Sequence, residues 1–334
     1  MPYINVDEAY ILDNTGLQVD QVVDIPYTDA ALTDGQKEQA RKNISAGSTN
    51  HNLLDNPFFT KGSIVNQRGI TTYACSGTEY NIDRWKSSSG NTITVADNGV
   101  TIVGSTGTHF NWSQPLAIGA YESVMGKTVT ASVMTKSGNI YTKTFVAPND
   151  IASGSLINIG VIQVTDGGVY SNIYITNKYS AISSNTYGFW LYSTGTALTV
   201  DLKAVKLELG TVSTLANDVP PDYGTELAKC RYYFERLKAT GNYAVFGLGM
   251  ATDTTHAAVL IPMSPKRVST YTISKSGTLG VIGGSSVTSI AKDETASNSA
   301  LNVYVTGTGF TANAIIILRA ANDGSAYIDV SAEL

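Results

Sequence analysis

From residue 51 onward, the sequence is a succession of short runs with β-strand character, each ended by turn-forming residues. Clear runs cover 92–95, 100–103, 128–135, 140–146, 156–164, 169–176, 187–193 and 198–209. Between them lie Asp97-Asn98-Gly99, Ser137-Gly138-Asn139 and Asp166-Gly167-Gly168. Asn, Asp and Gly tolerate the backbone conformations that tight turns require. Short strands at this spacing predict an antiparallel sandwich or jelly roll.

The composition of the chain agrees with a β-rich fold. Charged residues make up 15% of the chain, and it contains 31 glycines and 19 tyrosines against 8 phenylalanines. Aromatic and β-branched side chains pack well on a pleated surface, whereas disordered chains are usually richer in charge and poorer in aromatics. In the run 187–193 both faces are apolar. We therefore expect this strand to lie inside a sheet and not at its edge.

These patterns predict an all-β chain with an N-terminal extension, a jelly-roll β-sandwich and a second, C-terminal β-sandwich domain. The predicted parts are an N-terminal segment over 1–50, the jelly roll over 51–223, a linker helix and strand over 224–238, and the C-terminal domain over 239–334. In the C-terminal domain we expect no helix. Its expected strands cover 243–250, 256–263, 270–274, 300–306, 314–320 and 326–334.

The leader contains the signals of one short helix. Thr33 and Gln36 are spaced as a capping box, and Gly47 provides an end signal. Ala40 and Ile44 lie four residues apart and form a thin apolar face. A helix of about a dozen residues is marginal alone, so we expect these two residues to contact other copies of the chain or a docking partner. The alternative is a flexible leader.

Charge and hydropathy weigh against two classes of partner. The net charge is −5 and there is no long basic run, which argues against nucleic acid because phosphate binding needs clustered Lys and Arg. No stretch approaches the roughly 18 apolar residues of a membrane span, so we expect no membrane insertion. Residues 1–20 lack the features of a signal peptide. Cys75 and Cys230 are far apart in the sequence and are expected to be free, buried thiols.

The sequence offers little for catalysis. His51, His109 and His256 are widely separated, and none has the spacing of a metal site. Glycoside hydrolysis needs only two carboxylates about 5–10 Å apart, which scattered Asp and Glu residues could provide by converging in the fold. The alternative is that these carboxylates are solvated turn residues or partners of basic side chains. We expect a binding protein and not an enzyme.

Aromatic side chains are the candidate ligand-binding groups. Tyr and Trp combine a flat apolar body with a polar tip, which suits the C–H faces and hydroxyl groups of a sugar. We single out Trp112, Tyr141, Tyr170 and Tyr174. The alternative for each is a place in the core or at a subunit interface.

A structural calcium ion is a further candidate, and no other cofactor is expected. Asn56 near the first strand and Asp201 near the last strand of the predicted sandwich could share one edge and offer oxygen ligands. The alternative is that both are ordinary turn or surface residues.

Several segments resemble tail-fibre and baseplate-associated proteins of phages and prophages. In the leader, AYILDNTGLQVDQVVDIP is followed by LTDGQKEQARKNISA, which matches the recurrent LT-x-x-QK-x-QAR-x-NI-x-A pattern of such proteins. NLLDNPFFTKGSIVNQRG, YNIDRWK, GKTVTASVMTKSG and LTVDLKAVKLELG resemble their carbohydrate-binding-module-like jelly roll. PPDYGTELAKCRYYFERL, PMSPKRVSTYTIS and AYIDVSAEL resemble the segments that follow it. The chain departs from the pattern at Met263-Ser264-Pro265, where relatives have Met-Arg before the proline.

The resemblance implies a homotrimeric protein of the phage virion, released by lysis of the host. Residues 1–50 would bind other tail or baseplate proteins, and the loops 251–256, 275–287 and 307–313 would contact a bacterial surface glycan or protein receptor. Asn56-Pro57 and Asp83-Arg84-Trp85 would serve as framework. Two alternatives remain at this point. One is a spacer or baseplate decoration without a receptor, and the other is a polysaccharide depolymerase.

Overall fold

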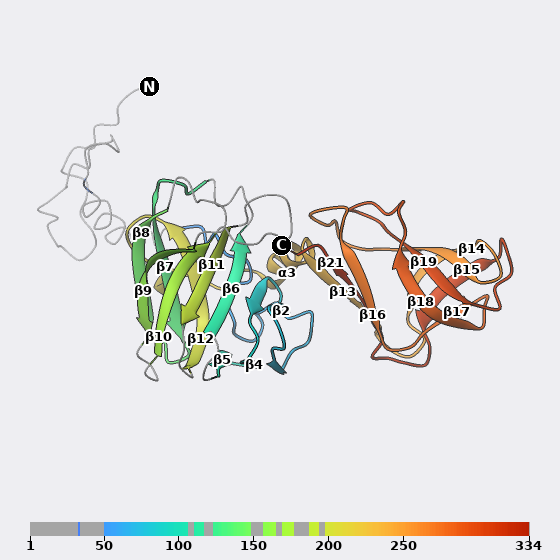
Figure 1. Ribbon diagram of the computed structural model, residues 1–334, viewed down its shortest axis with the longest axis horizontal. Helices are drawn as coiled ribbons and strands as arrows, with labels where there is room; N and C mark the ends of the chain where they lie inside the picture. The colour runs from blue at the N-terminus through green and yellow to red at the C-terminus, as the bar shows by residue number, and fades with distance from the viewer. Residues whose placement is uncertain are drawn as a thin grey trace, which may run out of the picture. The chain divides into compact units, whose positions relative to one another are not determined.

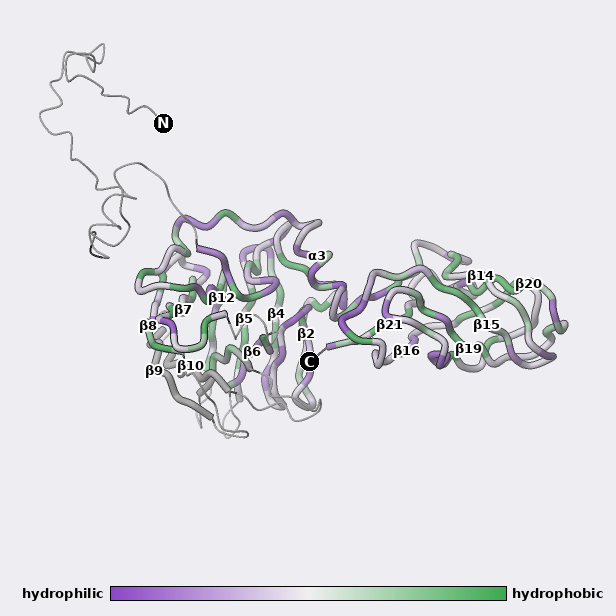
Figure 2. Tube along the Cα trace, turned by 90° about the horizontal axis from the view of Figure 1, so that it is seen from above, coloured by the Kyte–Doolittle hydropathy of each residue, from purple (hydrophilic) through white to green (hydrophobic). Residues whose placement is uncertain are grey.

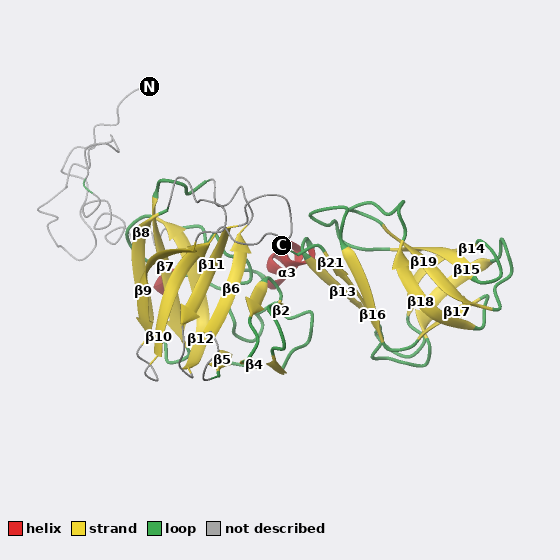
Figure 3. Ribbon diagram, in the orientation of Figure 1, coloured by secondary structure: helices red, strands yellow, loops and turns green. Residues whose placement is uncertain are grey.

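The computed structural model describes residues 33, 50–105, 110–116, 123–147, 156–164, 169–176, 187–193 and 198–333. For 156–164, 169–176 and most of 187–193 it describes the backbone alone. Residues Thr49–Leu334 form one compact unit. The described part is dominated by strands, with one α-helix and one short 3-10 helix, which confirms the all-β prediction (Figures 1 and 3). The helix expected in the leader, with Ala40 and Ile44, lies outside the described residues.

The first domain is a sandwich of two six-stranded antiparallel sheets. One sheet contains, in spatial order, β1 (Thr72–Ala74), β4 (Asn91–Ala96), β5 (Gly99–Gly104), β12 (Leu198–Leu209), β7 (Thr128–Thr135) and β8 (Ile140–Val146). The other contains β2 (Glu79–Ile82), β3 (Trp85–Ser87), β6 (Phe110–Leu116), β11 (Tyr187–Ser193), β10 (Val169–Thr176) and β9 (Leu156–Val164). Strand β11 lies between β6 and β10, so the prediction of an internal strand is confirmed.

Aromatic side chains fill the space between the two sheets. The rings of Trp85 and Trp112 stack with their centres 5.4 Å apart and their planes 3° from parallel. Phe59 packs edge-on against both rings, at 5.4 and 5.9 Å. Aliphatic side chains of β5, β7 and β12 close the core from the opposite sheet. Burial of these large apolar surfaces is the main driving force for pairing the two layers.

A short helix leads from the sandwich into the second domain. It is α3 (Tyr223–Arg231), and it follows the 3-10 turn η2 (Leu215–Asn217) and two prolines. The side chain of Asp222 caps α3 by accepting a hydrogen bond from the backbone N–H of Thr225. The next strand, β13 (Phe234–Lys238), pairs along its whole length with β21 (Tyr327–Ser331). The helix and the strand expected over 224–238 are therefore both present, and the strand belongs to a sheet of the C-terminal domain.

The C-terminal domain contains two sheets around one core. The three-stranded sheet has the order β13, β21 and β16 (Thr272–Ser276). The six-stranded sheet has the order β17 (Leu279–Ile282), β20 (Ile315–Ala320), β14 (Val245–Ala251), β15 (His256–Ile261), β19 (Leu301–Thr308) and β18 (Ser286–Lys292). Its two edge strands, β17 and β18, contact each other, so this sheet curls almost into a barrel. The prediction of a loop over 275–287 is wrong, because this segment contains β17.

Two glycines in β14 permit the close approach of β15. A Cβ atom on Gly249 would collide with the carbonyl oxygen of Ala258, and one on Gly247 would collide with that of Leu260. Glycine inside a strand often marks a site where another backbone approaches closely. The tight curl of the six-stranded sheet thus depends on the absence of a side chain at these positions.

Asn56 connects several segments at the entrance to the sandwich. Its side-chain amide donates hydrogen bonds to the carbonyls of Val65 (2.8 Å) and Asp83 (2.9 Å), and its side-chain oxygen accepts one from the Val65 N–H. Its own backbone N–H donates to Glu226 of α3 at 2.6 Å. Its carbonyl accepts a hydrogen bond from the indole of Trp85 at 2.8 Å. Asn56 is fully buried and has a φ of 49°, a left-handed conformation that asparagine tolerates better than most residues.

Replacing Asn56 by alanine should lower the free energy of unfolding by about 2–4 kcal/mol. The change leaves buried backbone groups without partners and places alanine in a left-handed conformation. Urea denaturation followed by tryptophan fluorescence measures the effect. The matched control is Asn98→Ala in an exposed turn, which should change the stability by less than about 0.5 kcal/mol. Equal stabilities of the two variants would contradict the role given to Asn56.

Candidate functional site

The structure does not support a sugar-binding role for Trp112. This residue lies in β6, whose side chains are all buried, and its ring stacks on Trp85 inside the sandwich. Since the ring is fully buried, it cannot present a face to a ligand, and that prediction is wrong. Tyr141 is partly buried and packs against the same core. Tyr170 and Tyr174 lie on β10, where only the backbone is described.

The predicted calcium ligands have other partners. The side-chain oxygen of Asn56 already accepts the hydrogen bond from Val65, so its assignment as a calcium ligand is wrong. Asp201 accepts a hydrogen bond from Thr101 and forms an ion pair with Lys136 at 3.2 Å. In the part of the chain that the structure describes, no group of three or more His, Cys, Asp or Glu residues could hold a metal ion.

A buried charged cluster joins the sandwich to the C-terminal sheet. Arg68 forms an ion pair with Glu333 at 2.8 Å and lies 3.7 Å from Asp83. Gln67 donates hydrogen bonds both to Asp83 and to the carbonyl of Phe234 in β13. Burial raises the pKa of the Glu333 carboxyl to about 7, and the neighbouring Arg68 opposes this rise. Each of these contacts joins one residue of the protein to another, so we assign the cluster a structural role.

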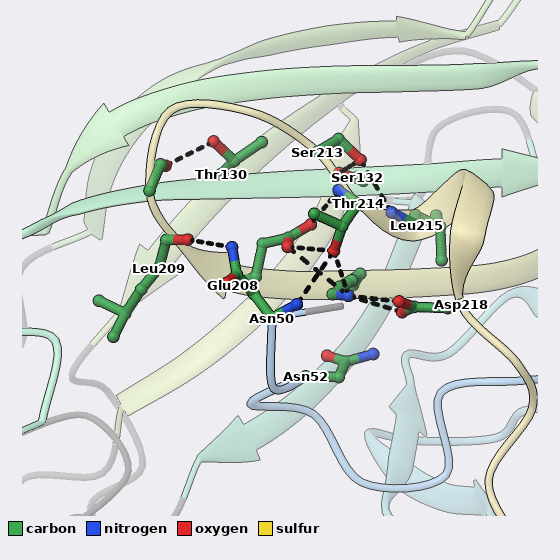
Figure 4. A network of polar contacts seen from close by, with 12 residues as sticks. Asn50, Asn52, Thr130, Ser132, Glu208, Leu209, Ser213, Thr214, Leu215 and Asp218 are labelled. Carbon is green, nitrogen blue, oxygen red and sulfur yellow. Dashed lines mark hydrogen bonds and ion pairs between the residues drawn. The ribbon is translucent and has the colours of Figure 1, made fainter. Parts of the chain in front are cut away.

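A second buried network surrounds Lys206 in β12, and Figure 4 labels its partners Thr214, Glu208 and Asp218. The Lys206 ammonium group donates hydrogen bonds to both carboxylate oxygens of Asp218, at 2.6 and 2.7 Å, and to the Thr214 hydroxyl at 2.7 Å. Glu208 lies 3.5 Å from the same ammonium group and accepts two hydrogen bonds from Thr214. The charges are thus paired internally. The network fastens the segment 210–218 to the sheet and exposes no reactive group.

Three connections gather at one end of the C-terminal domain. The β14–β15 turn meets the segment after β19 through backbone hydrogen bonds from Phe310 to Thr254 and from Asn313 to Ala251. The β17–β18 turn joins them, because the N–H of Ser285 donates to the carbonyl of Thr308. These turns belong to the three segments expected to contact a host, 251–256, 275–287 and 307–313. The fold therefore places parts of all three on one continuous surface.

Within this surface, the turn 252–255 is held by its own polar side chains. Asp253 accepts hydrogen bonds from the backbone and hydroxyl of Thr255, and its carboxylate lies 2.8 Å from the ring nitrogen Nδ1 of His256. These hydrogen bonds lower the pKa of the Asp253 carboxyl. The His256 ring stacks on Tyr304 with the ring centres 4.9 Å apart. The turn is thus an ordered, exposed polar element and not a loose loop.

The outer face of the six-stranded sheet is apolar and exposed. Strand register defines two rows of neighbouring side chains on this face. The first row is Ile282, Ile317, Leu248 and Leu260, and it ends beside Asn302 of β19. The second row is Ile315, Met250, Ala258 and Tyr304. Figure 2 shows the apolar stretches on β14, β15 and β20, and Ile315 is 69% exposed. We call these two rows the apolar face.

A groove of about 760 Å³ adjoins the first row. It shares Leu248 and Leu260 with the apolar face and is extended by Phe246, Pro262 and Met263. No charged residue lines it. A groove of this composition suits apolar side chains from a partner, and Ser299 is the polar residue of its lining. This surface was not predicted, although apolar residues on both faces of 245–251 signal it.

No family model, no curated protein and no solved structure matches the chain. Among the described residues, no helix is long and apolar enough to cross a membrane.

Replacing Lys206 by methionine should destabilise the sandwich by about 3–5 kcal/mol, because two carboxylates would remain buried without their counter-charge. Lys203→Met is the matched control in the same strand, where the side chain is only partly buried. It should change the stability by less than about 0.5 kcal/mol. Thermal unfolding of both variants measures the difference. A tolerated Lys206→Met would show that the network does not hold this segment in place.

Proposed function

We propose that this chain is a structural and host-recognition component of a phage tail, a fibre or receptor-binding protein that binds a bacterial surface glycan or protein. The sequence motifs of the leader and of the sandwich support this proposal. The all-β architecture, with its two β-domains in series, suits such a protein. In this role the protein binds and does not catalyse.

The observation that carries the proposal is the gathering of three connections at one end of the C-terminal domain. Surface connections on a rigid β-scaffold are common positions for recognition residues. Their side chains here are mostly small and polar, including Thr254, Ser285 and Thr311. Such groups make individually weak hydrogen bonds, which gain strength when several copies of the chain bind one surface. We propose that residues 1–50 attach these copies, as a homotrimer, to other proteins of the virion tail.

A spacer or baseplate decoration is the second candidate, and the burial of Trp112 favours it for the sandwich. Trp112, which was a candidate for sugar binding, is stacked on Trp85 and is part of the core. In this alternative the sandwich sets the distance between the virion and the C-terminal domain. It predicts that the protein binds no host cell at all.

Adding negative charge to the gathered turns should abolish cell binding without unfolding the protein. We predict that the double variant Thr254→Glu, Thr311→Glu binds susceptible bacteria at least about tenfold more weakly than the wild type, since each glutamate adds charge and bulk where contact is made. Flow cytometry of the fluorescently labelled full chain on a panel of strains measures binding. Both side chains are exposed, so circular dichroism should be unchanged.

The control for this experiment is Asn98→Glu, which adds a charge in an exposed turn of the sandwich. It should bind like the wild type. If the double variant binds as well as this control, recognition lies elsewhere. If even the wild type binds no strain in the panel, the spacer becomes the better description.

A further inference from the structure

We propose that the apolar face is the surface through which copies of this chain meet around a rotation axis. The inference rests on the proposed function in one respect, because a tail protein of identical chains supplies the copies. It goes further by assigning the contact to the two rows on β14, β15, β17, β19 and β20 and not to the leader alone.

The side chains of the apolar face are poorly suited to contact with water. Neither row contains a charged residue, and the exposed fractions of Leu248, Met250 and Leu260 are 57%, 51% and 56%. The nearest charged group on the same side of β20 is Arg319, whose guanidinium lies 4.9 Å from the centre of the Tyr243 ring. Large contiguous apolar patches on a protein surface mark sites of interaction.

The extent of the face matches a specific contact between proteins. Six large side chains of the two rows are between 37% and 69% exposed, namely Leu248, Met250, Leu260, Ile282, Tyr304 and Ile315. Together with Val245, which is 63% exposed in the adjoining groove, they form an apolar surface of seven large side chains. A standard interface buries about 800 Å² on each partner, around an apolar centre of this kind. The rest of an interface is usually a polar rim.

The composition of the face favours a second copy of the chain over a glycan or a charged partner. A glycan needs directional hydrogen-bond partners, and the rows supply aliphatic side chains with one tyrosine. An identical chain brings an identical apolar face, so the surface is complementary to itself in character. The groove beside Leu248 and Leu260 can accept side chains that protrude from a neighbour.

The position of the face also links assembly to recognition. His256 begins β15 directly after the turn 252–255, and Tyr304 of the second row stacks on it. Copies that meet through the apolar face would therefore hold their gathered turns side by side. Contacts between each turn cluster and the host would then act together, which raises the effective affinity.

Cysteine cross-linking of the full chain tests the proposal. Met250→Cys and Ile315→Cys each place one accessible thiol on the face. The two natural cysteines are buried, and burial raises the pKa of both thiols, so neither should react readily with the cross-linker. A short bis-maleimide should convert most of either variant to a covalent dimer, at twice the chain mass of 35.4 kDa. Ser274→Cys, exposed on β16 of the other sheet, should remain at the mass of one chain.

The outcomes separate this inference from the proposed function. If light scattering shows an oligomer but neither face variant cross-links above the Ser274→Cys control, the inference is overturned and the tail-protein proposal stands. A cross-link within one chain, found by mass spectrometry between the face and a residue of 1–48, would show that the leader covers the face and would also overturn it. A cross-linked dimer from a protein that binds no cell would support the interface and count against host recognition.

A charge-insertion variant gives an independent readout. Leu248→Lys combined with Leu260→Lys places two positive charges opposite each other on the first row. We expect at least a tenfold weaker self-association constant with unchanged circular dichroism, because both side chains are already more than half exposed. Thr272→Lys combined with Ser274→Lys on β16 is the matched control and should associate like the wild type. Retained association of the face variant would contradict the proposal.

Discussion

The satisfaction of buried polar groups around Asn56 is the constraint on which the rest of the structure depends. The side-chain amide of Asn56 donates hydrogen bonds to the backbone carbonyls of Val65 and Asp83. The backbone N–H of Asn56 donates a hydrogen bond to Glu226 in α3. Because a buried amide without partners costs free energy, these segments can pack only in the arrangement that satisfies it. The stacked Trp85 and Trp112 rings then fill the space that this arrangement creates.

The same constraint decides where binding can occur. The sandwich uses its tryptophans as core and pairs its buried charges, such as Lys206 with Asp218, so the described part of this domain offers a stable body and no open aromatic platform. The C-terminal domain differs. Its curled six-stranded sheet leaves apolar side chains on the outside, and its turns gather at one end. We therefore propose that this domain mediates assembly and recognition and that the sandwich acts as a spacer.

Most long strands could be predicted from the sequence, and the functional surfaces could not. The bounds of β7 to β12 follow from runs of strand-forming residues between clear turns. Strands β1 to β3 were missed because they are only three or four residues long, and β17 and β18 because Gly and Ser surround them. Trp112 was misassigned because alternation does not reveal which face of a strand meets the opposite sheet. Likewise, the exposed row of Leu248 and Leu260 is indistinguishable from core until the register is known.

We propose that this chain works as an assembly of identical copies. Sedimentation equilibrium of the purified full chain at micromolar concentration tests it most directly. The proposal predicts a single species at three times the chain mass of 35.4 kDa, with dissociation only on strong dilution. A species that stays at 35.4 kDa across this concentration range would contradict the claim. In that case the apolar face would bind a partner of another kind.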